Sequence, residues 1–262
     1  MITLLETIWG KGFMAPGGAG NVAKQVDGLD MAGKRVLDFG CGLGGPDHLL
    51  ARDYGANVVG IDLEEHLITA AKARAVELGV DHQTEFLVVE PGPLEFPDES
   101  FDVVLSSGAF TQIDEKQKSF EECLRVLKPG GVLTSYEWMK SEGEYSEDML
   151  YFFELEGLTY AMETPAGQAA SLRKAGFDEV TVVDRSAWYR AEVRREYERI
   201  RTNGFPRLVE LIGTKRAEHA VENWRATVVV CEKGEMLQVY SRAKRAQTSL
   251  PETTPETAPE TT

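Results

Sequence analysis

A glycine-rich run near the start of the chain has the residue types that let a backbone bind a nucleotide-like ligand. Residues 36–45 read VLDFGCGLGG, an apolar strand that leads into a helical pattern. Glycines at such a turn let a ligand approach the backbone closely. Gly40, Gly42 and Gly45 satisfy the dinucleotide fingerprint, and Asp62 lies where a ribose hydroxyl would be held. The loop by itself therefore admits a dinucleotide.

Asp38, two positions before the first glycine, favours a different ligand. Beside a pyrophosphate this carboxylate would be a like charge in a poorly screened site, whereas beside an ammonium group it would be attractive. S-adenosylmethionine has such an ammonium in its amino-acid moiety and no phosphate. We therefore expect S-adenosylmethionine as the cofactor and S-adenosylhomocysteine as its product, with a dinucleotide or a bare turn as the alternatives.

Further polar groups follow the next predicted strands in order. Asp62 can accept hydrogen bonds from both ribose hydroxyls, and Leu63 can cover one face of the adenine. Glu90 can accept from the adenine amino group. Ser106 and Ser107 end a strand at the switch point where open α/β sheets bind ligands. A solvated surface acid remains the alternative for Asp62 and Glu90.

The segment from Glu137 to Glu163 is rich in acidic and aromatic side chains and contains a single lysine. Such a surface suits an ammonium or a methylated amine through cation–π contacts of about 0.5–2 kcal/mol each. An amphipathic helix with solvated glutamates and core aromatics explains the same pattern equally well. Glu137, at the end of a strand, is the candidate general base, and Gln112 could orient an acceptor by hydrogen bonding.

The elements that position these residues alternate between strand and helix. Short apolar strands separated by helices predict a parallel, doubly wound α/β sheet. Strands are expected at 35–39, 57–61, 84–89, 101–106, 132–137, 179–184 and 235–242, the last of them as an antiparallel edge strand. Helices are expected at about 46–54, 64–78, 114–127 and 165–176, with a mostly helical stretch at 188–230.

We expect the chain to divide into three parts. Residues 1–30 form a loop-rich segment that caps the core, and residues 31–245 form one domain in which 138–165 and 188–230 are helical cap elements. Residues 246–262 are expected to be disordered, because their Pro-Glu-Thr repeat has no apolar bulk to offset the ordering entropy.

The amino-acid composition of the chain argues against several classes of binding partner. The formal net charge of −15 argues against a nucleic acid or an anionic membrane as partner, since both require clustered Lys and Arg. The three cysteines suggest no disulfide framework, and no Cys/His cluster has metal-ligand spacing, so no metal is expected. No window is apolar enough to span a membrane. We expect a cytoplasmic monomer or homodimer that acts on a small molecule.

The ordered motifs resemble those of class I S-adenosylmethionine-dependent methyltransferases. D-x-G-x-G is followed by G-I-D-L, by E-P ahead of F-D-V-V, and by L-K-P-G-G, all within residues 34–138. The resemblance implies a Rossmann-like, seven-stranded, mostly parallel sheet with helices on both faces and a reversed last strand. It also implies methyl transfer.

The stretch from Trp9-Gly10 to Gly17-Gly18, the run Gly42-Leu43-Gly44-Gly45 and the aromatic-rich ending before Tyr240 look like phosphoethanolamine N-methyltransferases, a weaker likeness that spans most of the chain. This likeness implies that the cofactor is contacted by Met14, Ala15, Gly40, Asp62, Leu63, Glu90, Pro91 and Ser107. To these the glycine loop and the end of the fourth strand add Asp38, Cys41, Gly42 and Ser106 as expected cofactor residues. The candidates for contact with the methyl acceptor are Trp9, Phe13, Phe110, Trp138 and Tyr160.

Departures from that likeness bear on the acceptor. Where the family has an Asp and a catalytic His after the fourth strand, this chain has Gly108 and Gln112, and two phosphate-contacting tyrosines align with Trp138 and Gln168. Pro91 lacks the backbone N–H that bonds adenine N1 in the family. We expect N-methylation of a small polar amine. The alternatives are O-, S- or C-methylation of a more apolar molecule, and a cofactor-binding module without catalysis.

Overall fold

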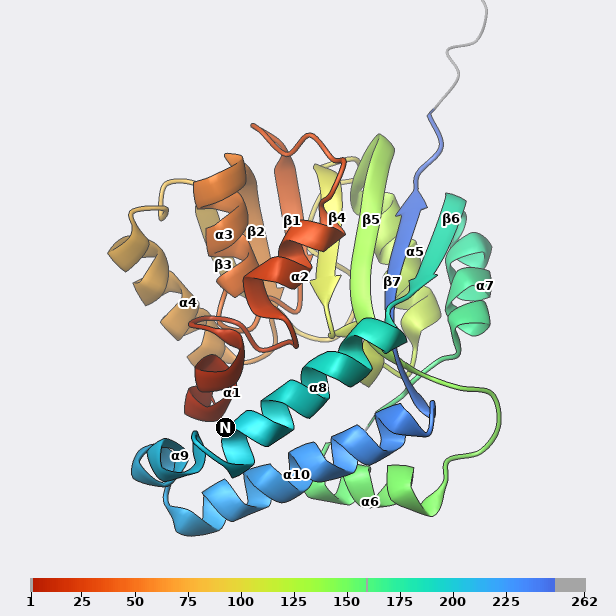
Figure 1. Ribbon diagram of the computed structural model, residues 1–262. Helices are drawn as coiled ribbons and strands as arrows, with labels where there is room; N and C mark the ends of the chain where they lie inside the picture. Colours follow the sequence, from red (N-terminus) through yellow and green to blue (C-terminus); the bar gives the residue numbers. More distant parts are fainter. Residues whose placement is uncertain (1, 159, 248–262) are drawn as a thin grey trace, which may run out of the picture.

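The computed structural model describes residues 2–158 and 160–247 and contains one seven-stranded sheet (Figure 1). The strand order is β3-β2-β1-β4-β5-β7-β6. The strands are β1 (Arg35–Phe39), β2 (Asn57–Asp62), β3 (Thr84–Val88), β4 (Phe101–Ser107), β5 (Leu127–Lys140), β6 (Asp178–Asp184) and β7 (Met236–Lys244). β1 to β5 are parallel, and β7 runs antiparallel to its neighbours β5 and β6. The mostly parallel sheet with a reversed last strand is confirmed, and β7 lies inside the sheet with β6 at its edge.

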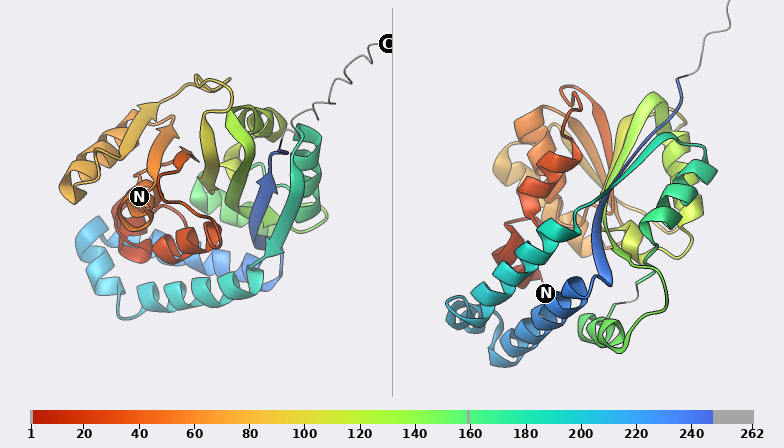
Figure 2. Two further views of the ribbon diagram at one scale, coloured as in Figure 1. Left: turned by 90° about the horizontal axis from the view of Figure 1, so that it is seen from above. Right: turned by 45° about the vertical axis from the view of Figure 1, so that its right-hand side comes forward.

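Helices cover both faces of the sheet and one of its ends (Figures 1 and 2). Along the sheet lie α2 (Gly18–Gln25), α3 (Gly45–Tyr54), α4 (Glu65–Leu78), α5 (Lys116–Val126) and α7 (Pro165–Ala175). At the end lie α1 (Ile2–Trp9), α6 (Glu147–Glu156), α8 (Ser186–Arg201), α9 (Phe205–Ile212) and α10 (Thr214–Glu232). A short 3₁₀ helix, η1 (Phe110–Gln112), follows β4.

The central strands are apolar on both sides because each side is covered by helices. Adjacent residues Val36 and Leu37 of β1 are fully buried on opposite faces. Val36 packs in a cluster with Val22 of α2 and Leu50 of α3, whereas Leu37 packs in a cluster with Phe120 of α5. This arrangement holds the strand ends rigidly, which is what a ligand site at those ends requires.

The helices at the end of the sheet form a cap with its own apolar core. α6, α8 and α10 pack together with α1 and α9 around buried residues such as Phe152, Tyr189 and Trp224. The parallel strands run toward this cap in Figure 1, so their carboxyl ends face it. The cap therefore covers the edge of the sheet at which open α/β folds bind ligands.

The N-terminal segment is more regular than the sequence suggested. Residues 1–30 contain two short helices, α1 and α2, instead of loops alone. Leu4 and Ile8 of α1 lie one turn apart and are buried in the cap core, which explains a helix in a Gly- and Pro-rich neighbourhood. The expected disorder of the tail falls almost wholly on residues 248–262, outside the described residues.

Candidate functional site

The site lies where the strand order reverses. β1 pairs with β2 on one side and with β4 on the other, so the helices that follow β1 and β4 cover opposite faces of the sheet. A crevice opens between the carboxyl ends of two such strands. The glycine loop follows β1 and the segment 107–112 follows β4, which places both beside this crevice.

The glycine loop is shaped by close contacts on two sides. Gly40 has φ +78°, and a Cβ there would lie 2.4 Å from the Cβ of Ala109. Gly42 has φ +54°, and a Cβ there would lie 2.8 Å from Sδ of Met14. Both positions therefore require glycine. Met14 lies over the loop and remains 36% exposed, as a residue in contact with a cofactor should.

Five N–H groups of the loop, those of Gly40, Cys41, Gly42, Gly44 and Gly45, are bonded within the protein. Those of Gly40 and Cys41 donate to the carbonyl of Ile61 at 2.9 and 3.0 Å. The N–H of Gly42 donates to Oδ2 of Asp62 at 2.9 Å. Since a pyrophosphate is held by free N–H groups at such a turn, the loop does not favour a dinucleotide.

Asp62 and Leu63 lie as an adenosine site requires. Asp62 ends β2, and its Oδ1 accepts from the N–H of Glu64 at 3.0 Å, so both carboxylate oxygens are held in place. Leu63 is 56% exposed beside it, in the turn between β2 and α4. Glu90 and Pro91 are exposed after β3. This part of the site presents an acid and an apolar surface next to each other.

Asp38 is fully buried and has no hydrogen-bond donor in the described structure. Asp47, in the first turn of α3, is equally buried and has no donor, and its carboxyl group lies beside that of Asp38. Burial, followed by the charge of Asp47, raises the pKa of Asp38 well above its ordinary value. Burial raises the pKa of Asp47 to about 7. Asp47 was not predicted as a site residue from the sequence, because an acid in a first helical turn is ordinary.

The end of β4 is fixed by a glutamine from α2. Gln25 is buried, and its Nε2 donates to the carbonyl of Ser106 at 2.8 Å, while its Oε1 accepts from the hydroxyl of Ser107 at 3.0 Å. Ser106 is itself buried and Ser107 partly exposed. Gln25 was not predicted from the sequence, since it lies about eighty residues from its partners.

Glu137 accepts hydrogen bonds from the segment that follows β4. Oε2 of Glu137 accepts from the N–H of Thr111 at 2.9 Å and from its hydroxyl at 2.8 Å, whereas Oε1 has only a 3.4 Å contact with Ser106. Burial raises the pKa of Glu137 to about 7, although the Thr111 hydrogen bonds and the charge of Lys116 lower it. Lys116 donates to the carbonyls of Ile113 and Ala161, which ties this segment to the cap.

Trp138 and Tyr160 meet in the cap. Their ring centroids lie 6.0 Å apart, and each lies 5.9 Å from the ring of Phe152. Nε1 of Trp138 is buried without a partner in the described structure. The hydroxyl of Tyr160 donates to Glu156 at 3.2 Å, and burial raises the pKa of that carboxyl group. These residues join aromatic surface and acid above the end of β5.

The other predicted acceptor residues lie elsewhere. Phe110 is fully buried in the sheet core between Phe39 and Phe120, with no surface for a substrate. Phe13 packs against the glycine loop, within 3.0 Å of a Cβ placed at Gly45. Phe110 and Phe13 therefore do not enter the proposed acceptor site.

Trp9 joins α1 to the cap. Its Nε1 donates to Oε1 of Glu196 at 2.8 Å, and Nε1 of Trp224 donates to Oε2 at 2.9 Å. Burial raises the pKa of Glu196 to about 7. Ala15 is partly buried in the same N-terminal segment, and Gln112 is exposed on η1.

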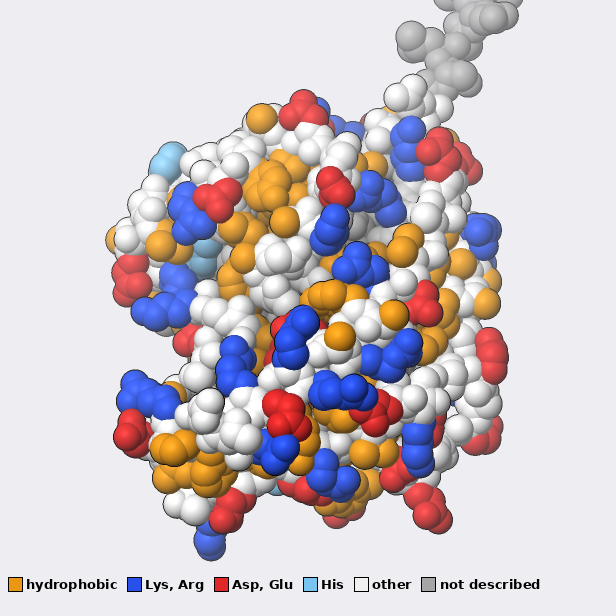
Figure 3. Space-filling model, in the orientation of Figure 1, with side chains coloured by type: hydrophobic (Ala, Val, Ile, Leu, Met, Phe, Trp, Pro, Cys, Tyr) orange, Lys and Arg blue, Asp and Glu red, His pale blue; other side chains and the backbone are white. Residues whose placement is uncertain are grey.

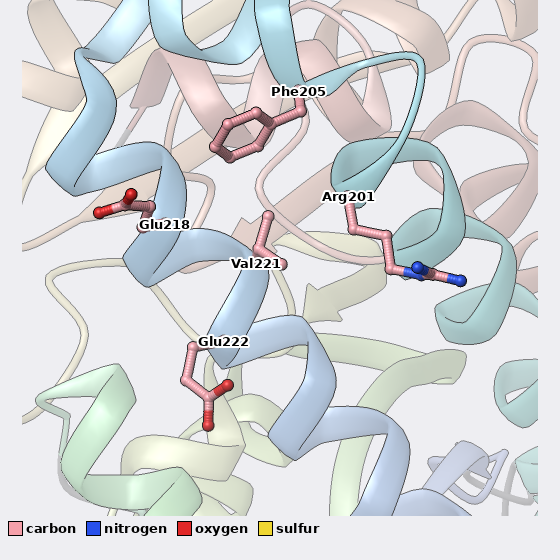
Figure 4. A pocket seen from close by; sticks show the side chains of 5 residues that line it. All are labelled: Arg201, Phe205, Glu218, Val221 and Glu222. Atoms are coloured by element: carbon pink, nitrogen blue, oxygen red, sulfur yellow. The ribbon is translucent and has the colours of Figure 1, made fainter.

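One surface groove lies outside this site. It has a volume of about 270 Å³ and lies on the outer side of the cap, between α8, α9 and α10 (Figure 4). Its lining residues are Arg201, Phe205, Glu218, Val221 and Glu222. Hydrophobic side chains gather nearby over α9, where Leu211 is 37% exposed (Figure 3). None of the predicted site residues lines the groove.

The described residues contain neither a metal-binding group nor a membrane-spanning helix. Within 2–158 and 160–247, no three His, Cys, Asp or Glu side chains come together as a metal-binding group. No helix in the same ranges is long and apolar enough to cross a membrane.

Comparisons with known proteins agree with the fold. Residues 37–135 match the family model of a methyltransferase domain. Phosphoethanolamine N-methyltransferase 3 from Arabidopsis thaliana is 30% identical over 241 residues, which are 92% of this chain and 48% of that protein. A sterol 24-C-methyltransferase from Gibberella zeae is 34% identical over 153 residues, 56% of this chain and 40% of that protein. The chain thus spans about half the length of the curated relatives it matches, or less.

A solved structure resembles the whole chain. Phosphoethanolamine N-methyltransferase 2 from Haemonchus contortus, in complex with phosphomonomethylethanolamine and S-adenosylhomocysteine, has a TM-score of 0.87 at 24% identity. The match covers 94% of this chain and 57% of that chain. Residues 37–135 therefore match a methyltransferase domain, and 94% of the chain shares the fold of this solved N-methyltransferase.

Proposed function

We propose that this chain binds S-adenosylmethionine at the glycine loop and transfers its methyl group to a small molecule, most readily to the nitrogen of an amine. The observation that carries the proposal is the chemistry of the loop. Five of its N–H groups are bonded within the protein, while the buried carboxyl groups of Asp38 and Asp47 have no donor in the described structure. Such a site suits a ligand that carries an ammonium and no phosphate.

The remaining cofactor residues fit the same ligand. Asp62 can accept from the ribose hydroxyls through the outer lone pairs of its fixed oxygens, and Leu63 offers an apolar surface for the adenine. Met14 lies above Gly42, where it can exclude water from the cofactor. When bound, S-adenosylmethionine supplies a methyl group on a positively charged sulfur, so the protein's main task is to position the acceptor in line with it.

The acceptor in this proposal lies between the end of β5 and the cap. Trp138 and Tyr160, which are only partly buried, offer aromatic faces, and Glu156 adds negative charge, which together favour a cationic or methylated amine. Glu137 is the proposed proton acceptor, because an amine must lose a proton before it attacks. Its Oε1 is not engaged by Thr111, and its pKa of about 7 is suitable for a base at neutral pH.

Methylation of carbon on an apolar acceptor is the second candidate. Similarity to a sterol 24-C-methyltransferase supports it, as does the apolar character of the cap above β5. A nucleic-acid acceptor is not proposed, because the chain carries a formal net charge of −15.

An acceptor screen tests the proposal. The protein is incubated with S-adenosylmethionine and small amines, including phosphoethanolamine, next to sterols and hydroquinones, and release of S-adenosylhomocysteine is measured. We expect turnover with an amine, and sterol or hydroquinone turnover alone would favour the second candidate. Binding of the cofactor without turnover of any acceptor in the panel would favour a third possibility, a cofactor-binding module without catalysis.

The variant Glu137→Gln tests the base. Glutamine keeps an oxygen for Thr111 but takes no proton, so kcat should fall at least about tenfold and lose its pH dependence near 7. Glu142→Gln, an exposed acid after the same strand, is the matched control. An unchanged kcat in Glu137→Gln would remove this residue from the mechanism.

A further inference from the structure

The two carboxyl groups below the glycine loop lie in an environment with no compensating donor. Asp38 comes from the end of β1 and Asp47 from the first turn of α3, and both side chains are 0% exposed. None of their four oxygens has a hydrogen-bond donor in the part of the chain that the structure describes. Two unpaired charges at this depth would cost many kcal/mol, so the pair must hold a proton between its oxygens.

The residues around Asp38 and Asp47 leave room for both carboxyl groups but supply no positive charge. A Cβ at Gly60 of β2 would lie 2.6 Å from Oδ1 of Asp47, so glycine at this position is what makes room for the second carboxyl group. The other titratable groups that face the pair are Asp62 at the end of β2 and the thiol of Cys41 in the loop. Asp62 adds further negative charge, and neither group supplies a cation.

We propose that Asp47 is a positioning residue for the cofactor's ammonium group, acting through Asp38, and that the pair releases its shared proton to solvent when that ammonium binds. This inference rests on the proposed cofactor. The free pair carries one negative charge and one proton. When the ligand binds, the proton goes to solvent and the pair carries two negative charges, of which the ammonium balances one. The sequence motif assigns a role to Asp38 alone, whereas the geometry joins Asp47 to it.

If binding of the cofactor releases a proton, the affinity for the cofactor must change with pH in a definite direction. Because the ammonium favours the fully ionised pair, the affinity for the cofactor should rise with pH, by up to about tenfold per unit while one proton is released. Burial and the charge of Asp47 hold the pKa of Asp38 well above its ordinary value, so the free pair still carries the shared proton at neutral pH, where this rise is expected. A pair that served the fold alone would keep its proton in both states, and the affinity would not depend on pH in this range.

Calorimetric titration with S-adenosylhomocysteine tests the proposal. The binding enthalpy is measured at neutral pH in buffers of different ionisation enthalpy, and its slope gives the number of protons released. For the wild-type protein we expect close to one proton. Asp47→Asn can donate an amide N–H to Asp38 in place of the shared proton, so its slope should fall toward zero and its affinity should become independent of pH.

Three controls make the result decisive. 5′-Methylthioadenosine lacks the amino-acid moiety, so its binding to the wild-type protein should release no proton. Asp53→Asn changes an exposed acid of the same helix, which pairs with Arg52, and should leave the slope unchanged. Thermal unfolding of Asp47→Asn should confirm that the variant is folded.

The outcomes are distinguishable. An equal proton count in the wild-type protein and in Asp47→Asn would overturn the role of Asp47, even with normal cofactor affinity. Absence of any binding of S-adenosylhomocysteine to the wild-type protein would overturn the proposed function together with this inference.

Discussion

Buried carboxyl groups occur at both sides of the site, and they differ in their partners. On the cofactor side, Asp38 and Asp47 have no donor in the described structure. On the cap side, Glu137 accepts two hydrogen bonds from Thr111, and Glu196 accepts from two tryptophan side chains. Burial raises the pKa in all four cases. Burial and a shifted pKa therefore do not by themselves distinguish a ligand-binding acid from a structural one.

The hydrogen-bond partners do distinguish them. An acid that is satisfied by the protein stabilises the fold, and its removal leaves buried donors without an acceptor. An acid without a donor destabilises the free protein and becomes favourable when a cationic ligand arrives. Variants on the two sides should therefore differ in what they lose: cap-side variants should lose stability, together with kcat in the case of Glu137, and cofactor-side variants should lose affinity for the cofactor.

The largest effect is expected for Glu137→Ala. It leaves the N–H and hydroxyl of Thr111 buried without an acceptor and opens a cavity, which should lower the free energy of unfolding by about 3 kcal/mol. Denaturant unfolding measures the change. Glu137→Gln, which keeps an acceptor oxygen, should cost about 1 kcal/mol. Equal losses in the two variants would show that the hydrogen bonds of Thr111 contribute nothing.

A smaller loss of stability is expected for Glu196→Leu. Both indole N–H groups, of Trp9 and Trp224, lose their acceptor, and the free energy of unfolding should fall by about 2 kcal/mol. Because Trp9 fixes α1, hydrogen exchange in residues 2–9 should also become faster. Glu196→Gln keeps one acceptor oxygen and should lose less. Unchanged exchange in α1 would contradict the role of this contact.

The pH dependence of the free energy of unfolding should report on the buried acids of the cofactor side and of the cap side together. Between the ordinary carboxyl values and about pH 7, the folded chain binds more protons at Asp47, Glu137 and Glu196 than the unfolded chain does. The free energy of unfolding should therefore fall as the pH rises from about 4 through 7. Saturating S-adenosylhomocysteine should reduce this slope, since it ionises the aspartate pair. A stability that rises over this range would contradict the raised pKa values.

The sequence predicted the cofactor side well because its signals are local. The bounds of β1 agree with the expected 35–39, and the loop, Asp38 and Asp62 lie close together along the chain. The strand alternation and the glycines that the fold requires are visible in a short window. This is the part of the chain that the methyltransferase family model matches.

The cap side could not be predicted in the same way. Trp9 and Glu196 are 187 residues apart, and Thr111 and Glu137 are 26 apart, so their pairing depends on the folded arrangement. Phe110 illustrates the same limit, since an aromatic residue after β4 could face either the crevice or the core, and the structure places it in the core. α1 was missed because its eight residues bury only two apolar side chains.

The affinity of S-adenosylhomocysteine for Asp38→Asn, measured together with the free energy of unfolding without ligand, tests the account most directly. Loss of a charge-assisted contact with the ammonium should weaken binding by about 10- to 100-fold. The free energy of unfolding should stay the same or rise, because the variant removes a buried acid that has no donor. Unchanged affinity with a large loss of stability would contradict the account, since Asp38 would then serve the fold instead of the cofactor.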